Sequence, residues 1–190
     1  MVTARNTRSD VVAAAGRLFA ERGYHGTSMR DLGRELGLLG SSLYAHVDSK
    51  QDLLVEVVEE GAGLFQDSAQ RALTVGGSGS DRLRALIAGH VDVVLDNQDV
   101  VRTFLNEARM LDETHRARVL AARDAYERAF RTVISDGVGD GSIREVNPKI
   151  ASIFILSILN AVERWYRADG ELDRDALADA IVSFALIGIG

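Results

Sequence analysis

The chain has 190 residues and no cysteine, which excludes disulfide frameworks and thiolate chemistry. Hydrophobic residues make up 46% of it, enough for a substantial core, and 22 basic residues against 28 acidic ones give a net charge of −6. The N-terminus lacks the charged and then apolar pattern of a secretion signal, and the longest uncharged segment, residues 150–162, is too short to span a bilayer. We therefore expect a cytoplasmic protein with no membrane partner.

The sequence predicts an all-α fold, because it contains a single proline and long stretches with apolar residues at a helical spacing of about 3.6. Its charge is divided unevenly, with +2 over residues 1–50 and −8 over residues 51–190. Local charge steers association, so the more basic end could approach phosphate while the acidic body stays away. A chance fluctuation of a few charges would give the same division. We expect these two parts, 1–50 and 51–190, to be separate domains.

The first predicted helix covers residues 8–22, with a glycine directly after it. Thr7 and Asp10 have the spacing of a capping pair, in which a hydroxyl and a carboxylate satisfy backbone amides at the helix start. Arg5 and Arg8 at this end could contact a phosphate backbone or remain solvated, and the sequence favours neither. The inward stripe of this helix is Val11, Ala14, Ala15, Leu18 and Phe19.

The next segment predicts a helix, a tight turn and a second short helix. Thr27 and Ser28 can both cap the first of these helices, and Asp31 completes the Ser-x-x-Asp capping pattern. Gly33 stands where two closely crossing helices would leave room for little more than a hydrogen atom. Gly37 follows the last apolar residue, where a left-handed residue commonly ends a helix.

The second helix of this pair is predicted over residues 39–46, with Leu43 facing inward. The groups on its other sides are small or form hydrogen bonds, which suits a DNA groove better than a core. These positions are Gly40, Ser41, Ser42, Tyr44 and His46.

Residues with constrained roles in this helix-turn-helix agree with one family pattern in a single register: Gly23-Tyr24, Thr27, Leu32, Leu36, Gly37, Leu43-Tyr44 and Ser49-Lys50. The segment resembles the DNA-binding part of TetR/AcrR-family transcriptional regulators. The resemblance implies three N-terminal helices that bind DNA and a C-terminal helical domain for ligand binding and dimerisation, about nine helices in all. Leu39 and Gly40 stand where family members often carry a polar cap and a lysine, so one phosphate or base contact is lost.

The resemblance also implies which residues bind DNA. The candidates for phosphate contacts, which supply most salt-dependent affinity, are Thr27, Tyr44, His46 and Lys50. The alternative for Tyr44 is half burial against the first helix. Because the recognition helix has few strong base-reading groups, we expect DNA shape and dimer spacing to contribute to specificity. The rest of the predicted DNA-binding set is Ser28, Arg30, Gly40, Ser41 and Ser42.

The remaining chain predicts a series of longer helices. The first of them is opened by the capping pair Ser49 and Asp52, and Pro148 suits the first turn of a later one. The predicted ranges are 50–72, 81–96, 100–110, 114–136, 148–167 and 173–188, with a Gly/Ser connector at 75–80 and a loop at 137–147.

The helix predicted at 148–167 is apolar nearly all round, so it must be covered on every side. A partner subunit is the simplest cover, and the alternative is the core of a monomer. Together with the helix at 173–188 it resembles the pair that forms the family's four-helix dimer interface. Two-fold symmetry would place two recognition helices roughly 34–36 Å apart, one turn of DNA, or farther if the DNA deforms. The predicted interface residues are Ile155, Leu159, Val162, Ile181, Phe184 and Ala185.

Aromatic and basic residues crowd the end of the helix at 148–167, and Trp165 is the only tryptophan. Aromatics beside arginines suit a ligand with a flat base and phosphates. The C-terminal half resembles, more loosely, TetR-family members that sense acyl-CoA thioesters of lipid, aromatic or steroid catabolism. The alternative is that these aromatics only fill the core or the dimer edge. The predicted ligand-binding residues are His90, Asn106, Arg109, Asn160, Arg164, Trp165, Tyr166 and Arg167.

The sequence contains no Gly-rich phosphate loop, Cys–His pair or serine elbow, and its four histidines lack the spacing of a metal site. We therefore expect no enzyme activity, no cofactor and no metal. The favoured interpretation is a homodimeric, ligand-responsive repressor that a small-molecule effector releases from a palindromic operator in double-stranded DNA; activation stays open. The alternative is a helical small-molecule binding protein or an enzyme whose N-terminal motif only packs.

Overall fold

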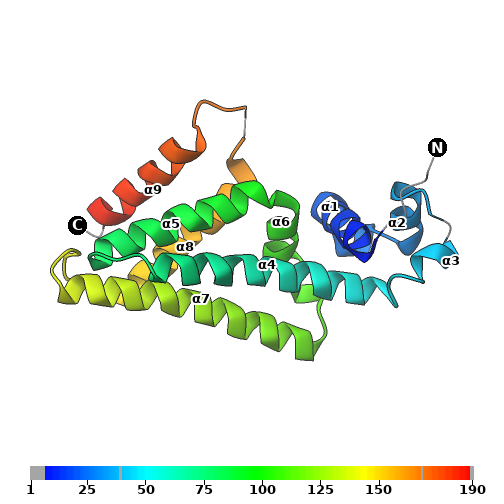
Figure 1. The fold of residues 1–190 in the computed structure, drawn as a ribbon, viewed down its shortest axis with the longest axis horizontal. Helices are drawn as coiled ribbons and strands as arrows, with labels where there is room; N and C mark the ends of the chain where they lie inside the picture. The colour runs from blue at the N-terminus through cyan, green and yellow to red at the C-terminus, as the bar shows by residue number, and fades with distance from the viewer. Residues whose placement is uncertain (1–6, 39, 168, 189–190) are drawn as a thin grey trace. The chain divides into compact units, whose positions relative to one another are not determined.

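The computed structural model describes residues 7–38, 40–167 and 169–188, and in these ranges it contains helices and no strand. Figure 1 shows the helices in chain order, from blue at the N-terminus to red at the C-terminus. The predicted all-α fold is confirmed. No helix in the described ranges is long and apolar enough to cross a membrane. The elements are α1 (Arg8–Gly26), α2 (Met29–Glu35), α3 (Gly40–Leu43), α4 (Lys50–Leu73), α5 (Gly79–Asp96), α6 (Gln98–Asn106), the 3₁₀ helix η1 (Ala108–Met110), α7 (Glu113–Gly139), α8 (Pro148–Trp165) and α9 (Arg174–Gly188).

The chain forms two compact units. The first unit is Met1–Ala62 with Asp99–Leu120, so it joins α1, α2 and α3 to the first part of α4, to η1 and to nearly all of α6. The second unit is Gly63–Gln98 with Ala121–Gly190. Compact packing units and functional domains are different divisions of a chain, so the expected domain boundary between residues 50 and 51 stays a prediction.

Helix α1 begins at the predicted capping box. The Thr7 hydroxyl accepts a hydrogen bond from the Asp10 amide at 3.3 Å, and the Asp10 carboxylate accepts one from the Thr7 amide at 2.7 Å. These bonds hold the pKa of Asp10 below its ordinary value. Gly23 has a φ of 73°, a left-handed value that breaks the helix at the predicted position, and helical residues resume up to Gly26.

The turn after α2 is a Schellman motif. The Leu38 amide donates to the Gly33 carbonyl at 2.8 Å, the Gly37 amide donates to the Arg34 carbonyl at 3.3 Å, and Gly37 has a φ of 64°. The prediction of a left-handed Gly37 is confirmed. A Cβ at Gly33 would lie 3.0 Å from the Leu38 carbonyl oxygen. The backbone of the turn, rather than a crossing helix, is therefore what requires glycine at this position.

The second unit is built around α5, which packs against α9 and α8. The start of α5 lies close to the end of α7, because a Cβ on Gly79 would be 2.2 Å from Gly137 Cα. The Gly79 amide also donates to the Asp140 carboxylate at 2.7 Å. The predicted connector at 75–80 is too long: Ser78 forms a capping box with the residue three positions on, so Gly79 and Ser80 already belong to α5.

Other helix ends also differ from the predictions. Helix α7 continues to Gly139, into the predicted loop, and the predicted helix at 100–110 is a shorter α6 followed by η1. Helix α8 begins as predicted, with Asn147 as its N-cap and Pro148 in its first turn, but it ends at Trp165. Tyr166 and Arg167 therefore lie beyond the helix.

Candidate nucleic-acid interface

The segment from α2 to α3 carries a hollow of about 260 Å³ at its surface. Tyr44 beside this hollow is 55% exposed, which argues against half burial as its role. Arg30 is exposed and forms no hydrogen bond or ion pair with any residue that the structure describes. An unpaired guanidinium and a phenol at a concave surface are groups that can bind phosphate and enter a groove. The hollow is lined by Met29, Arg30, Gly33, Leu38 and Tyr44.

The other predicted DNA-binding residues differ in how available they are. Ser42 is exposed and His46 is half-buried. Ser28 is exposed, but its hydroxyl accepts a hydrogen bond from the Asp31 amide at 3.2 Å and so serves as the cap of α2. Arg5 and Leu39 lie outside the described part of the chain, and for Gly40 and Ser41 only the backbone is described.

Thr27 and Lys50, two predicted phosphate contacts, point inward instead. Thr27 is 2% exposed, and its hydroxyl lies 3.1 Å from the Leu18 carbonyl and 3.0 Å from that of Gly23. Lys50 Nζ donates to the carbonyls of Tyr24 and Thr27, both at 2.9 Å, and lies 4.0 Å from the centroid of the Tyr24 ring. A cation at the carbonyl end of a helix stabilises it. Both residues therefore hold the end of α1 and are not free for phosphate.

The segment that follows α6 is hydrogen-bonded to the end of α1 and the start of α4, a connection that sequence analysis missed. Glu107 accepts a hydrogen bond from the Tyr24 amide at 3.1 Å. The Tyr24 hydroxyl donates to Gln51 at 2.8 Å, and Gln51 Nε2 donates to the Met110 carbonyl at 3.3 Å. Glu107 and Tyr24 stand 83 positions apart in the chain, so no local pattern could have indicated their contact.

A buried polar pair lies within the second unit. His90 is 1% exposed, its Nδ1 is 3.1 Å from the Tyr126 hydroxyl, and its ring centroid is 4.7 Å from that of Phe65. Burial lowers the pKa of His90 to about 3, so the ring is neutral at physiological pH. If the hydroxyl donates to Nδ1, His90 Nε2 carries the hydrogen and is a buried donor that no described residue accepts from. The opposite tautomer would leave both Nε2 and the hydroxyl hydrogen unpaired.

Two family descriptions match this chain. "Bacterial regulatory proteins, tetR family" matches residues 11–57, and "Tetracyclin repressor-like, C-terminal domain" matches residues 76–189. This chain belongs to the TetR family. It is accordingly a helix-turn-helix transcriptional regulator that binds DNA and responds to a ligand.

Relatives of this TetR-family regulator match it over nearly the whole chain. The HTH-type transcriptional repressor KstR2 of Rhodococcus jostii is 28% identical over 187 residues, covering 96% of this chain and 90% of the relative. The structure of the TetR-family regulator PfmR of Thermus thermophilus is 31% identical with a TM-score of 0.87, covering 95% and 98%. The structure of AibR in complex with isovaleryl coenzyme A and operator DNA is 26% identical with a TM-score of 0.86, covering 94% and 97%.

The predicted ligand-binding residues of the regulator are spread over both compact units. Asn106 and Arg109 belong to the first unit and are exposed, whereas the other six belong to the second. Trp165 is 50% exposed, so it does not serve only to fill the core. Arg164 is exposed and lies 3.5 Å from the Glu163 carboxylate. Of the rest, Asn160 and Tyr166 are half-buried, Arg167 is exposed and His90 is buried.

In this TetR-family regulator, the apolar residues of α8 and α9 that are open to a partner subunit differ from most of the predicted interface residues. Five of the six predicted interface residues have at most 6% of their surface exposed within the protomer: Ile155, Leu159, Val162, Ile181 and Ala185. Phe184, the sixth, is 63% exposed. The buried five form the inward stripes of α8 and α9, and a helix that is apolar all round does not reveal from sequence which stripe faces inward. The large apolar residues that these helices expose are Ile150, Ile153, Phe154, Trp165, Phe184 and Ile187.

Proposed function

We propose that this TetR-family regulator is a homodimeric repressor. Two α2–α3 pairs bind the half-sites of a palindromic operator, and an effector bound by the C-terminal domain favours a spacing of these pairs that fits the operator less well. Operator affinity then falls by the difference in effector affinity between the two states. The protein acts by binding, without a catalytic step, in the cytoplasm where its DNA is.

The observation that carries operator binding is the exposed hollow between α2 and α3 with its unpaired arginine. Two other arginines of this region are paired with carboxylates: Arg34 lies 3.4 Å from Asp31, and Arg17 lies 3.6 Å from Glu35. Arg30 has no such partner among the described residues and keeps its charge for a ligand. A cation at a concave surface is the pattern expected for phosphate binding.

Selection from a random duplex library tests this proposal, using the full-length protein. We expect recovery of a palindromic site. Arg30→Met should then weaken binding to every sequence and lower the slope of log affinity against log salt by about one, because one phosphate contact is lost. Lys50→Met is the matched control: its charge is bonded within the protein, so the slope should stay unchanged even if α1 is destabilised. Fluorescence anisotropy at several salt concentrations gives both slopes. Recovery of no preferred duplex would contradict operator binding.

For the effector we propose an acyl-CoA thioester. The AibR neighbour, solved with isovaleryl coenzyme A, supports this class. The residues support it too: exposed Trp165 near Arg164 and Arg167 offers stacking and charge to a nucleotide with phosphates. The unpaired Nε2 of neutral His90 offers a donor to a thioester carbonyl.

Calorimetry with isovaleryl-CoA, a long-chain acyl-CoA and free CoA tests the effector class. We expect the acyl thioesters to bind, and the tightest of them to release the selected duplex. Free CoA should bind more weakly, because it lacks both the acyl chain and the thioester carbonyl. If none of the three binds, the proposed effector class is wrong. This result would not affect the proposal of operator binding, which the selection experiment tests separately.

A further inference from the structure

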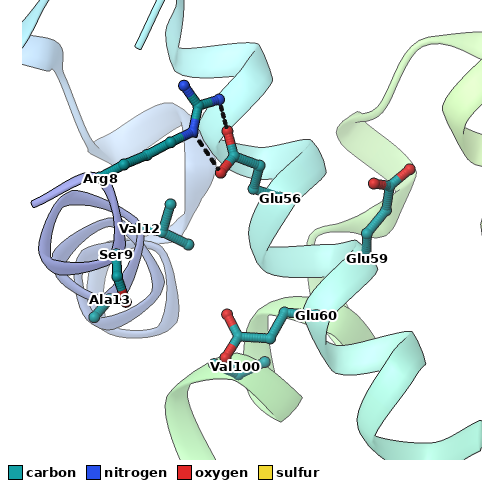
Figure 2. Close-up of a pocket in the computed structure, with 8 residues that line it drawn as sticks. All are labelled: Arg8, Ser9, Val12, Ala13, Glu56, Glu59, Glu60 and Val100. Carbon is teal, nitrogen blue, oxygen red and sulfur yellow. Dashed lines mark hydrogen bonds and ion pairs between the residues drawn. The ribbon is translucent and has the colours of Figure 1, made fainter. Parts of the chain in front are cut away.

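Arg8, at the start of α1, reaches two other elements of the first unit. Figure 2 shows its guanidinium facing Glu56 of α4, with two bonds drawn between them. Arg8 Nε donates to Glu56 Oε2 at 3.2 Å, and Nη2 donates to the other carboxylate oxygen. A third bond runs from Arg8 Nη1 to the His46 carbonyl at 2.8 Å. One side chain thus joins α1, α4 and the turn that follows the recognition helix α3.

The surroundings of Arg8 are acidic. The hydrogen bond and charge of Glu56 are the main causes that raise the pKa of Arg8, and the charges of Asp48 and Asp52 add to this effect. A DNA phosphate at this place would meet three carboxylates and a guanidinium that is already paired. Like charges repel more strongly the closer they lie, so this end of α1 is a poor phosphate site.

The pair borders a cavity of about 520 Å³ in the first unit, which Glu60 and Val100 also line (Figure 2). The Arg8 side chain is 58% exposed, and an exposed ion pair contributes little to stability. The effect of the pair must therefore come from where it holds the His46 carbonyl. The amides of His46 and Val47 both donate to the carbonyl of Leu43, the last residue of α3, at 3.0 and 3.3 Å. Fixing His46 consequently fixes the end of α3.

We propose that Arg8 and Glu56 form a latch that holds α3 in its reading orientation, so that both are positioning residues for operator binding and neither contacts DNA. The consequence for affinity rests on the proposed operator binding, whereas the latch itself does not. Arg30, not Arg8, then supplies a phosphate contact from the first unit.

The latch and simple electrostatics predict opposite changes in operator affinity for Glu56→Gln. Removing a negative charge near DNA should raise affinity if only charge matters. The latch predicts a fall, because an amide offers one acceptor in place of two and turns a donor towards the guanidinium. Glu60→Gln is the matched control, since Glu60 lies on the same helix, lines the same cavity and has no hydrogen bond or ion pair with a described residue.

Operator affinity is measured on the duplex that wild-type protein selects from the random library. We expect Arg8→Met and Glu56→Gln each to weaken binding about tenfold with an unchanged salt slope, and the double variant to be no weaker than either. Arg8→Lys should not restore affinity, because an ammonium cannot make the forked pair and the carbonyl bond together. Glu60→Gln should bind as well as wild type or slightly better.

Hydrogen exchange of the His46 and Val47 amides tests the latch without DNA. Exchange should be faster in Arg8→Met and Glu56→Gln than in Glu60→Gln and wild type. Unchanged exchange overturns the latch. It is equally overturned if Glu56→Gln binds DNA like Glu60→Gln while Arg8→Met lowers the salt slope by about one, which would make Arg8 a phosphate contact. A wild-type protein that selects no duplex overturns the proposed function instead, and the exchange measurement still decides the latch.

Discussion

The two compact units differ in the kind of surface that they leave exposed. In the first unit, Thr27, Lys50 and Arg8 are bonded to carbonyls or carboxylates within the unit, although the Arg8 side chain is itself exposed. In the second unit, apolar groups turn outward: Phe154 and Phe184 are each 63% exposed. In both units, the side chains that can bind another molecule are those that the protomer leaves exposed. In the first unit these exposed side chains are polar and suit DNA. In the second unit they are apolar and suit a partner subunit.

The shortness of two helices in the first unit accounts for part of this difference. Helices α2 and α3 span only Met29–Glu35 and Gly40–Leu43, and helices this short are not stable by themselves in water. The capping box at Ser28 therefore supports α2, and the bond from Arg8 to the His46 carbonyl supports the turn after α3. The second unit contains long helices such as α8 and α9, whose apolar surface exceeds what one protomer buries. Variants that disturb a close contact, the exposed apolar surface or a buried polar group should distinguish the two units.

Gly79→Ala should disrupt the second unit most. Its new Cβ would lie 2.2 Å from Gly137 Cα and 2.3 Å from the Gly137 nitrogen, which are backbone atoms that cannot move aside cheaply. We expect the free energy of unfolding to fall by about 3 kcal/mol or more in chemical denaturation. Gly139→Ala on α7 is the control, since a Cβ at that residue would have nothing within 4 Å, and it should be neutral or slightly stabilising. Equal free energies of unfolding for the two variants would refute the close contact between α5 and α7.

Phe154→Glu and Phe184→Glu should separate the protomers. A carboxylate placed on an apolar contact loses the buried ring and is costly to desolvate, so we expect the dimer dissociation constant to rise about a hundredfold. Sedimentation equilibrium measures it. Leu120→Glu serves as control, because Leu120 is 52% exposed on α7, outside the expected interface. A dimer that tolerates both Phe variants would place the interface on another surface.

His90→Phe should change how stability depends on pH. The pKa of His90 falls from an ordinary value of 6.5 to about 3 on folding, so below pH 6.5 the unfolded chain takes up a proton that the folded chain refuses. Stability conferred by the neutral ring is therefore complete above pH 6.5 and is lost as pH falls towards 3. Relative to His90→Phe, the wild type should lose about 2 kcal/mol between pH 7 and pH 5. Parallel stability curves for the two proteins at fixed concentration would contradict a buried, neutral His90.

Local signals in the sequence predicted much of the fold. The capping boxes at Thr7 and Ser28 and the left-handed Gly37 lie where the sequence places them, because each depends on neighbours within a few positions. The residues that line the hollow beside Arg30 lie within one short segment, although the hollow itself was not predicted.

Contacts between distant parts of the chain could not be predicted from local sequence patterns. The charge of Lys50 indicated a phosphate contact, yet its partners are carbonyls at the end of α1. The bond between Arg8 and Glu56 joins residues 48 positions apart. For α8, the apolar residues themselves were evident, but a helix that is apolar all round carries no periodic signal for its inward face.

By itself, the sequence determined an all-helical chain with a capped helix-turn-helix, because helix periodicity, capping and turn geometry arise from short-range sterics and hydrogen bonding. Only the tertiary structure decided which charges remain free and which apolar stripe remains exposed. Those outcomes depend on which donor meets which acceptor after packing. A lysine bonded to two carbonyls and an arginine open to solvent are both simply cations until the helices are in place.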